Sequence, residues 1–171
     1  MAASCTVWYL RMQSPVGPLF VAAGENGLRC VQFHRNGLPQ AARDEVWIES
    51  RAALRTYTRQ LRAYFRGELR EFICRLDLRG TAFQKECWEA LRSIPYGTTC
   101  TYADIALKVG RPQAVRAVGQ ANHRNPIAII VPCHRVIGAQ GTLTGYGGGL
   151  DVKEKLLRLE GAMLQPSLVF A

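Results

Sequence analysis

A cysteine beside a histidine, in the run Pro132-Cys133-His134-Arg135, is the pair of residues in this chain best suited to nucleophilic chemistry. The thiolate is the nucleophile, and because a free thiol has a pKa of about 8.5, a nearby base or cation must raise its share at neutral pH. The apolar residues 127–131 that precede the run predict a buried strand or extended core segment. Since neighbours in such a segment point to opposite sides, contact between Cys133 and His134 requires a local turn or a bridging water. A cysteine in such a segment is most often an inert small hydrophobe, and the residues alone leave that alternative open.

Two short helices with the spacing of a helix-turn-helix precede this run. Thr101 is placed to cap a helix that Gly110 ends, and Pro112 predicts the start of a second helix that reaches about Asn122. The second helix offers mainly Ala and Gly with a single Arg116, so it would read few bases but could fit closely into a narrow groove. The alternative is that its alanines only pack against neighbouring helices.

The charge distribution favours a polyanion as partner. Lys and Arg number 22 against 13 acids, a formal net charge of +9. Between Arg92 and Arg135 the only acid is Asp104, whereas in the N-terminal half we expect arginines to alternate with acids along a solvated helix face.

The six cysteines are widely scattered in a chain large enough to fold without disulfides, so we expect reduced thiols. No Cys-x-x-Cys pair occurs; Cys5, Cys30 and His34 are the one group that could converge on a metal, and we predict no metal site. No apolar run reaches about 18 residues and the N-terminus lacks the pattern of a signal peptide. The expectation is a cytoplasmic protein without a membrane partner.

The pattern predicts two domains, residues 1–79 and 80–171. The first is expected to hold an antiparallel meander and one helix, with a turn at 14–18, strands at 6–11, 19–23 and 28–33, and a helix from about Arg51 to Arg66. In the second, a capping box at 81–84 predicts a helix to about Arg92, residues 141–149 are too rich in glycine for regular structure, and Asp151 to Glu154 are expected to cap a final helix that Gly161 ends.

From about residue 80 to residue 161 the sequence resembles the O6-alkylguanine-DNA alkyltransferases, or methylated-DNA–protein-cysteine methyltransferases, of the bacterial type. The matching stretches are GTAFQ (80–84), IPYGTT (94–99), RAVG (116–119), NPI (125–127), IVPCHRVIG (130–138), GYGGG (145–149) and LLRLE (156–160). The first half is similar only loosely, through SPVGP (14–18) and YFRG (64–67). The resemblance implies an α+β fold: a small ribonuclease H-like domain of β-sheet and helix, followed by a mostly helical winged helix-turn-helix domain that binds DNA.

The resemblance also implies roles for individual residues. Cys133 would accept the alkyl group, His134 would draw off the thiol proton through a water, Glu160 would orient that histidine, Asn125 would brace the turn before the cysteine, and Tyr102 would donate its hydroxyl to the base. DNA contacts are expected from Arg116, Ala117, Gly119, Thr99, Tyr102 and Arg124, with Arg116 filling the gap left by a flipped nucleotide, and the substrate pocket from Tyr146, Gly147, Gly148 and Val136.

The implied activity is direct-reversal DNA repair by a methyltransferase that reacts once. An alkyl group on O6 of guanine, or on O4 of thymine, would move irreversibly to Cys133 from double-stranded DNA, without a cofactor. We expect a monomer, with several molecules able to line up along DNA. Some relatives bind zinc in the N-terminal domain, but Gly24 and Arg29 stand at corresponding positions here, so that site is not expected.

Two other functions remain compatible with these residues. One is a non-catalytic, lesion-binding alkyltransferase-like protein, although such proteins carry another residue in place of the cysteine. The other is a cysteine hydrolase that uses Cys133 and His134, which predicts repeated turnover and gives the helix-turn-helix no purpose.

Overall fold

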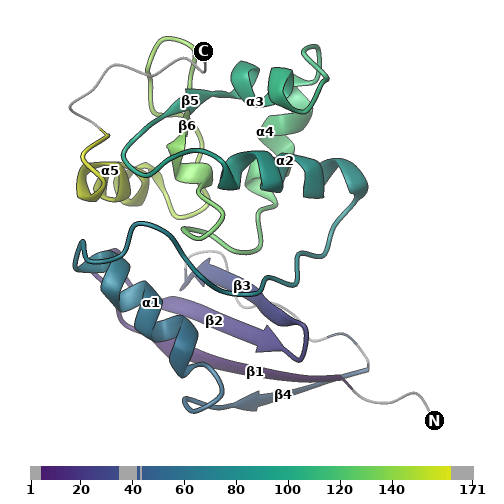
Figure 1. Ribbon diagram of the computed structural model, residues 1–171, viewed down its shortest axis with the longest axis vertical. Coiled ribbons are helices and arrows are strands. Elements are labelled where there is room, and N and C mark those ends of the chain that lie inside the picture. Colours follow the sequence, from purple (N-terminus) through teal and green to yellow (C-terminus); the bar gives the residue numbers. More distant parts are fainter. Residues whose placement is uncertain (1–4, 35–41, 43, 163–171) are drawn as a thin grey trace. The chain divides into compact units, whose positions relative to one another are not determined.

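The first third of the chain folds into a four-stranded sheet, and the expected meander is confirmed. The computed structural model describes residues 5–34, 42 and 44–162, which divide into two compact units at Leu78 and Arg79 (Figure 1). In the first unit β1 (Cys5–Met12), β2 (Leu19–Gly24) and β3 (Gly27–Phe33) pair antiparallel in sequence order.

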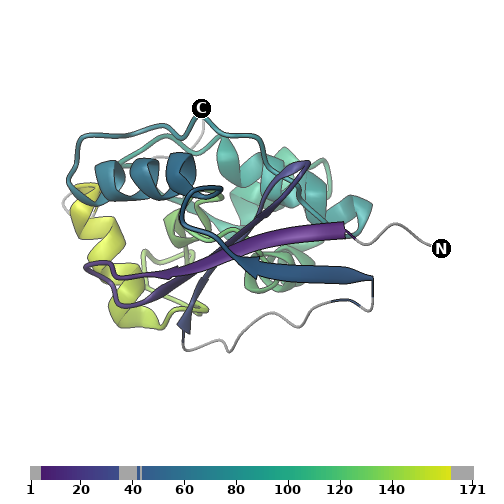
Figure 2. The same cartoon turned by 90° about the horizontal axis from the view of Figure 1, so that it is seen from below.

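A fourth strand, β4 (Glu45–Glu49), was not expected from the sequence. It pairs parallel with β1, so the sheet order is β3-β2-β1-β4, and the two strands run side by side in Figure 2. The strand carries acids at both ends, and Val46 and Ile48 are about half exposed, so the strand lacks the buried alternation that would have marked it.

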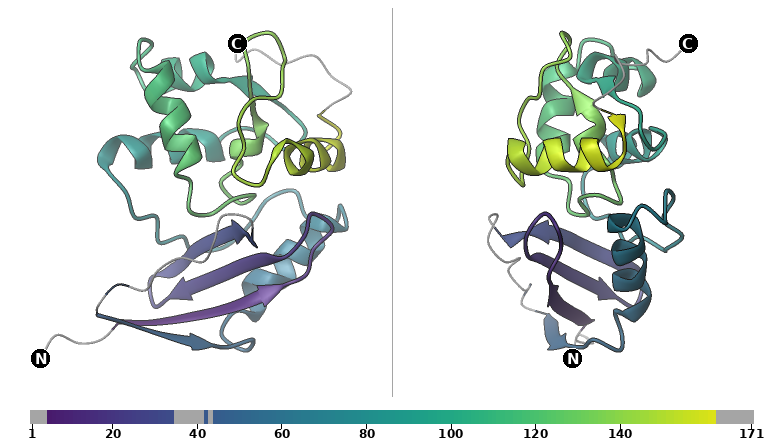
Figure 3. Two further views of the ribbon diagram at one scale, coloured as in Figure 1. Left: turned by 180° about the vertical axis from the view of Figure 1, so that it is seen from behind. Right: turned by 90° about the vertical axis from the view of Figure 1, so that its left-hand side faces the viewer.

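Helix α1 (Arg55–Phe65) lies across one face of this sheet (Figure 3) and buries Leu61 and Tyr64 completely. Its predicted start at Arg51 is wrong, because residues 51–54 form turns before the helix begins. Its end is as expected: Gly67 adopts a φ of +72°, which glycine accepts without the steric cost of a Cβ.

The charge pattern expected for the helix is also wrong. Arg55, Arg59 and Arg62 lie on α1, which contains no Asp or Glu. Off the helix, Arg29 on β3 does have acidic partners: it contacts Glu45 at 2.5 Å and Asp77 at 3.7 Å.

The second unit begins with two helices whose N-cap residues were predicted correctly. The hydroxyl of Thr81 accepts from the backbone N–H of Gln84 at 3.2 Å at the start of α2 (Ala82–Arg92), and Thr101 accepts likewise from Asp104 at 3.1 Å. Thr101 thereby opens α3 (Tyr102–Lys108), which places Tyr102 at the first position of the helix.

The second helix of the helix-turn-helix, α4 (Val115–His123), begins three residues later than predicted, because Pro112 lies in a turn. Helices α2, α3 and α4 pack against one another, and the indole N–H of Trp88 on α2 donates to the carbonyl of Ala121 on α4 at 2.9 Å. This buried bond ties α4 to the core of the unit.

The last elements lie next to each other in the same unit. Strands β5 (Cys100–Thr101) and β6 (Val136–Ile137) form a short parallel pair, and α5 (Leu150–Leu159) closes the unit. The predicted cap at Asp151 is wrong: Gly149, with φ of +93°, occupies the N-cap position and no side chain caps the helix. Residues 141–149 form no helix or strand, as expected.

Two further features of the described residues concern chemistry. All six cysteines are free thiols, as predicted. Within residues 5–34, 42 and 44–162, no helix is long and apolar enough to cross a bilayer, and no group of three His, Cys, Asp or Glu side chains is arranged to hold a metal ion.

Candidate active site

The apolar run before Cys133 is a chain of tight turns, and the expected extended segment is wrong. The N–H of Ile130 donates to the carbonyl of Ala128 at 2.9 Å, and Ile129 between them has a φ of +74°, a strained conformation for a β-branched residue. A second three-residue turn follows, in which the N–H of Cys133 donates to the carbonyl of Val131 at 2.8 Å. The turns deliver Cys133 into a single turn of 3-10 helix, η2 (Cys133–Arg135).

Asn125 holds these turns in place. Its Oδ1 accepts from the N–H of Ile127 at 3.0 Å, and its Nδ2 lies 2.8 Å from the carbonyl of Val131 and 3.1 Å from Sγ of Cys133. One amide therefore fixes both ends of the turn and also contacts the thiol, which is the bracing position that the resemblance implies for it.

His134 and Glu160 meet although 26 residues separate them in the sequence. Nε2 of His134 lies 2.8 Å from Oε1 of Glu160, and both side chains are fully buried. Because an ionised carboxylate can only accept, Nε2 carries the proton and Nδ1 is left as an acceptor. Nδ1 is buried and has no hydrogen-bond partner among the described residues.

Arg135 is a member of this cluster that the sequence did not suggest. Its Nε donates to Oε2 of Glu160 at 2.8 Å, its Nη2 to Oε1 at 3.0 Å, and its Nη1 to the carbonyl of Ile94 at 2.6 Å. The backbone N–H of Gly97 adds a contact to Oε2 of Glu160 at 3.3 Å. The buried carboxylate therefore has a fixed positive charge beside it and donors to both oxygens.

Burial governs the protonation of these groups. It raises the pKa of the Cys133 thiol, against the hydrogen bond from Asn125 and the charge of Lys153, and it lowers the pKa of His134 although Glu160 opposes this. Burial alone would raise the pKa of Glu160, but its contacts with His134 and Arg135 hold it well below the usual range. At neutral pH the site therefore contains a neutral thiol, a neutral imidazole and an ionised carboxylate.

Lys153 is a second residue that sequence reasoning missed. Its ammonium group is completely buried and donates to the carbonyls of Val136 at 2.6 Å and Thr144 at 2.7 Å. These two bonds connect β6 to the glycine-rich loop, residues 141–149. Burial lowers its pKa to about 8. A signal was present, because Lys153 lies three and four residues before the buried Leu156 and Leu157, on the apolar side of α5.

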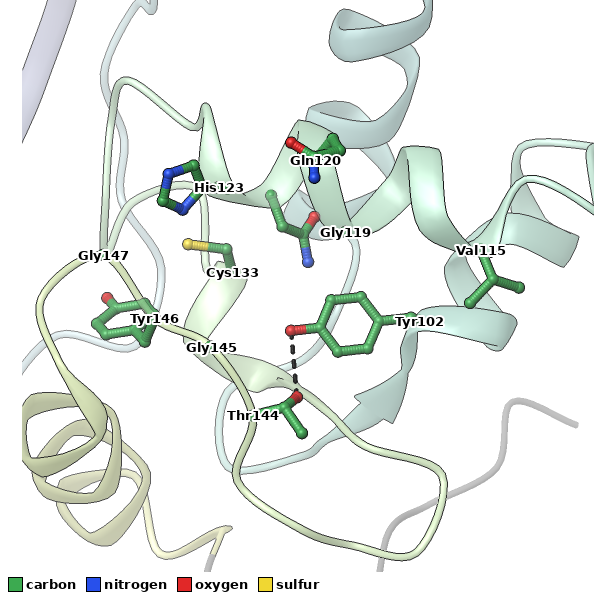
Figure 4. Close-up of a pocket in the computed structure, with 11 residues that line it drawn as sticks. Tyr102, Val115, Gly119, Gln120, His123, Cys133, Thr144, Gly145, Tyr146 and Gly147 are labelled. Carbon is green, nitrogen blue, oxygen red and sulfur yellow. Dashed lines mark hydrogen bonds between the residues drawn. The ribbon is translucent and has the colours of Figure 1, made fainter.

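A cavity of about 390 Å³ opens beside Cys133, a residue that is 8% exposed. Its lining comes from α3, α4, η2 and the glycine-rich loop, and consists of Tyr102, Val115, Gly119, Gln120, Asn122, His123, Cys133, Thr144, Gly145, Tyr146 and Gly147 (Figure 4). The hydroxyl of Thr144 donates to that of Tyr102 at 3.4 Å. The cavity is therefore a pocket with a thiol in its wall, a phenol in another wall and small residues between them.

Of the residues predicted for substrate and DNA, some lie around this cavity and others do not. Tyr102, Gly119, Tyr146 and Gly147 line it, and Arg116, Ala117 and Arg124 are exposed on or next to α4. The other three predicted residues neither line the cavity nor are exposed: Val136 and Gly148 are buried, and Thr99 is only 7% exposed, which leaves little of its side chain for a phosphate.

Comparison with known proteins gives the same description for both halves of the chain. Residues 82–162 match the model of the 6-O-methylguanine DNA methyltransferase DNA-binding domain, and residues 7–90 match that of the ribonuclease-like domain of the same enzymes. The fold is thus the α+β arrangement that the resemblance implied.

Individual relatives cover nearly all of the chain. Methylated-DNA–protein-cysteine methyltransferases from Methanosarcina acetivorans and Mycobacterium leprae are 53% and 51% identical to it, over 91% and 92% of this chain and 99% and 94% of theirs. A crystal structure of the Mycobacterium tuberculosis OGT in complex with DNA superposes with a TM-score of 0.80 at 50% identity, covering 92% of this chain and 93% of that one. The chain belongs to the methylated-DNA–protein-cysteine methyltransferase family.

The buried carboxylate gives the first prediction. Replacing Glu160 by Gln keeps its shape but leaves Arg135 charged and unpaired in the interior, and breaking a buried ion pair from one side costs about 3–5 kcal/mol. We expect Glu160→Gln to lower the free energy of unfolding by about that amount in a denaturant titration.

The matched control is Glu154 on α5, the helix that Glu160 directly follows. Glu154 and Arg158 form an ion pair at 2.6 Å in which the side chains are 40% and 68% exposed, so Glu154→Gln should cost less than about 0.5 kcal/mol. Similar losses for the two variants would show that the Glu160 cluster contributes no more than a surface pair.

Proposed function

We propose that this protein repairs DNA by moving the alkyl group of O6-alkylguanine, and of O4-alkylthymine, onto Sγ of Cys133. The observation that carries the proposal is the thiol of Cys133 in the wall of a pocket, next in sequence to a histidine that is held by a buried carboxylate. The names of the relatives and the DNA complex of a 50% identical protein support alkylated DNA as the substrate. No second function has an observation of its own.

Proton removal from Cys133 falls to His134. The raised pKa keeps the thiol protonated in the resting protein, so a base must accept its proton as the sulfur attacks. His134 is neutral, its Nδ1 is the free acceptor, and a bridging water can connect Nδ1 to the thiol. The imidazolium that forms then lies against the ionised Glu160.

The transfer itself is a single displacement. The S–C bond to the alkyl carbon forms as the C–O6 bond breaks, and the electron pair of that bond remains on the guanine. Tyr102, in the pocket wall, donates its hydroxyl toward the base and so stabilises the negative charge of the leaving group. The thiol proton, taken up by His134, is passed on to the dealkylated guanine, which remains part of the DNA strand. A thioether has no leaving step under these conditions, so each molecule reacts once.

The reactive base must leave the duplex to reach Cys133, because its O6 is inside the stack. The exposed Arg116 near the start of α4 is positioned to enter the gap, and Ala117 with Gly119 allows α4 to approach the groove closely. Arg124, just after the helix, supplies charge for a phosphate. The proposed partner is double-stranded DNA, bound by one monomer or by several in a row, in the cytoplasm.

The direct test uses a duplex that carries one O6-methylguanine. Intact mass and peptide mapping should show one methyl group per molecule, on Cys133, and Cys133→Ala should bind the duplex without becoming methylated. Continued product formation beyond one equivalent would indicate a hydrolase, and an unmodified wild-type protein that retains binding would indicate a lesion-binding module.

The pH dependence tests the role of His134. Transfer requires the neutral imidazole, and burial lowers the pKa of His134, so the rate should stay constant as the pH falls through about 6.5 and decline only below it. The measurement is the transfer rate from about pH 5 to pH 9 on folded protein. A rate that rises about tenfold for each pH unit from 7 to 9 would instead mean that the Cys133 thiolate forms without the histidine.

Arg116 should matter only when a base has to leave the stack. We expect Arg116→Ala to slow methyl transfer from duplex DNA by at least about tenfold, and to leave the reaction with a free O6-alkylguanine nearly unchanged. Parallel rate measurements with the two substrates check this. Equal losses with both would place Arg116 outside the flipping step.

A further inference from the structure

Asn122 is an unusual residue for its place in the fold. It lies on the buried side of α4 together with Val118 and Ala121, and only 8% of it is exposed. Asparagine is a poor helix former, and an apolar side chain at this position would pack in the core without any polar group to satisfy. Local structure and packing therefore give no reason for an amide here.

Neither polar atom of this amide is satisfied by the protein. Oδ1 and Nδ2 of Asn122 are both buried, and neither has a hydrogen-bond partner among the described residues. By contrast, both amide atoms of Asn125, three residues later, are hydrogen-bonded. Because an unmade hydrogen bond in the interior costs free energy, each such group in a folded protein requires an explanation.

The position of Asn122 explains the unpaired amide, since Asn122 lines the same pocket as Cys133 and Tyr102. Its amide offers one acceptor and one donor group side by side. A ligand that satisfies both must present an adjacent donor and acceptor.

The Watson–Crick edge of O6-alkylguanine has this pattern. Alkylation at O6 removes the proton from N1, which becomes an acceptor, and the neighbouring N2 amino group is a donor. O4-alkylthymine presents N3 and O2, which are both acceptors, so the carbonyl oxygen of an amide there would face a lone pair.

We propose that Asn122 is a specificity-determining residue that reads this edge of the flipped base, with Nδ2 donating to N1 and Oδ1 accepting from the N2 amino group. The inference rests on the proposed function, because it needs the base in the Cys133 pocket. It adds that the pocket selects alkylguanine over alkylthymine through the N2 group.

The test compares two duplexes that differ in that single group: one with O6-methylguanine and one with O6-methylhypoxanthine, which lacks the 2-amino group. Wild-type protein should methylate Cys133 about tenfold faster with the 2-amino group, the size of one hydrogen bond whose partner is otherwise left buried and unpaired. In Asn122→Leu the ratio of the two rates should fall to about one, and the preference over O4-methylthymine should narrow as well.

Two variants serve as controls. Asn122→Asp keeps an acceptor for the N2 amino group, so it should retain the preference even if its absolute rate is lower. Gln120→Leu removes an exposed amide from the same helix and pocket and should leave the ratio unchanged. A thermal melt of each variant verifies folding, and Asn122→Ala replaces Asn122→Leu in the comparison if leucine does not fit.

The failures of the two proposals are distinguishable. Methylation of Cys133 with the same substrate ratio in wild type and Asn122→Leu, or no preference in wild type, would overturn the role of Asn122 and leave the repair function intact. No methylation of wild-type protein by either duplex would overturn both.

Discussion

A single buried carboxylate, Glu160, holds the reactive segment of this protein in one conformation. It follows the last turn of α5 and accepts hydrogen bonds from His134, from Arg135 and from the backbone of Gly97. Three segments that are distant in sequence therefore converge on two oxygen atoms. A buried carboxylate costs free energy unless it is paired with a positive charge and its oxygens accept hydrogen bonds. The guanidinium of Arg135 supplies both the charge and two of these hydrogen bonds.

The same arrangement explains why strain is tolerated next to the nucleophile. Ile129 is held at a positive φ and the chain turns twice within residues 127–133, which costs free energy of about 1–3 kcal/mol for an unfavourable residue. Asn125 anchors the segment before Cys133 and Glu160 anchors the two residues after it. With both sides fixed, the thiol direction is set by the backbone and does not depend on a flexible side chain.

The sequence predicted the elements that local chemistry determines. The capping boxes at Thr81 and Thr101 and the end of α1 at Gly67 are signals within a few residues, and the structure has them where expected. The strand β4 and the turns in the apolar run were missed, because pairing partners and tertiary anchors decide them. For the apolar run at 127–131, the sequence pattern indicated burial correctly and conformation wrongly.

The candidate site divides in the same way. The run around Cys133 was specific enough to indicate a family, and through that resemblance Glu160 was paired with His134 in advance. Spacing alone could not have paired them, nor could it have shown that Arg135 turns inward to the same carboxylate. Lys153 and Asn122 are the informative misses, because each is a polar residue on the apolar side of a helix. A polar residue on a buried face was the signal, and its meaning became visible only with the neighbouring carbonyls and the pocket.

A thiol that can react only once must not react with the wrong electrophile. Most reactive cysteines have lowered pKa values, yet burial raises that of Cys133, so at neutral pH it is a poor nucleophile toward molecules in solution. In the proposed reaction its reactivity depends on His134, a base that is equally buried, and on an alkyl group that fits the pocket and so brings its carbon to the sulfur. Under the proposed mechanism, burial therefore has two effects: it keeps the thiol unreacted between lesions, and it confines activation to the geometry in which a flipped base fills the cavity.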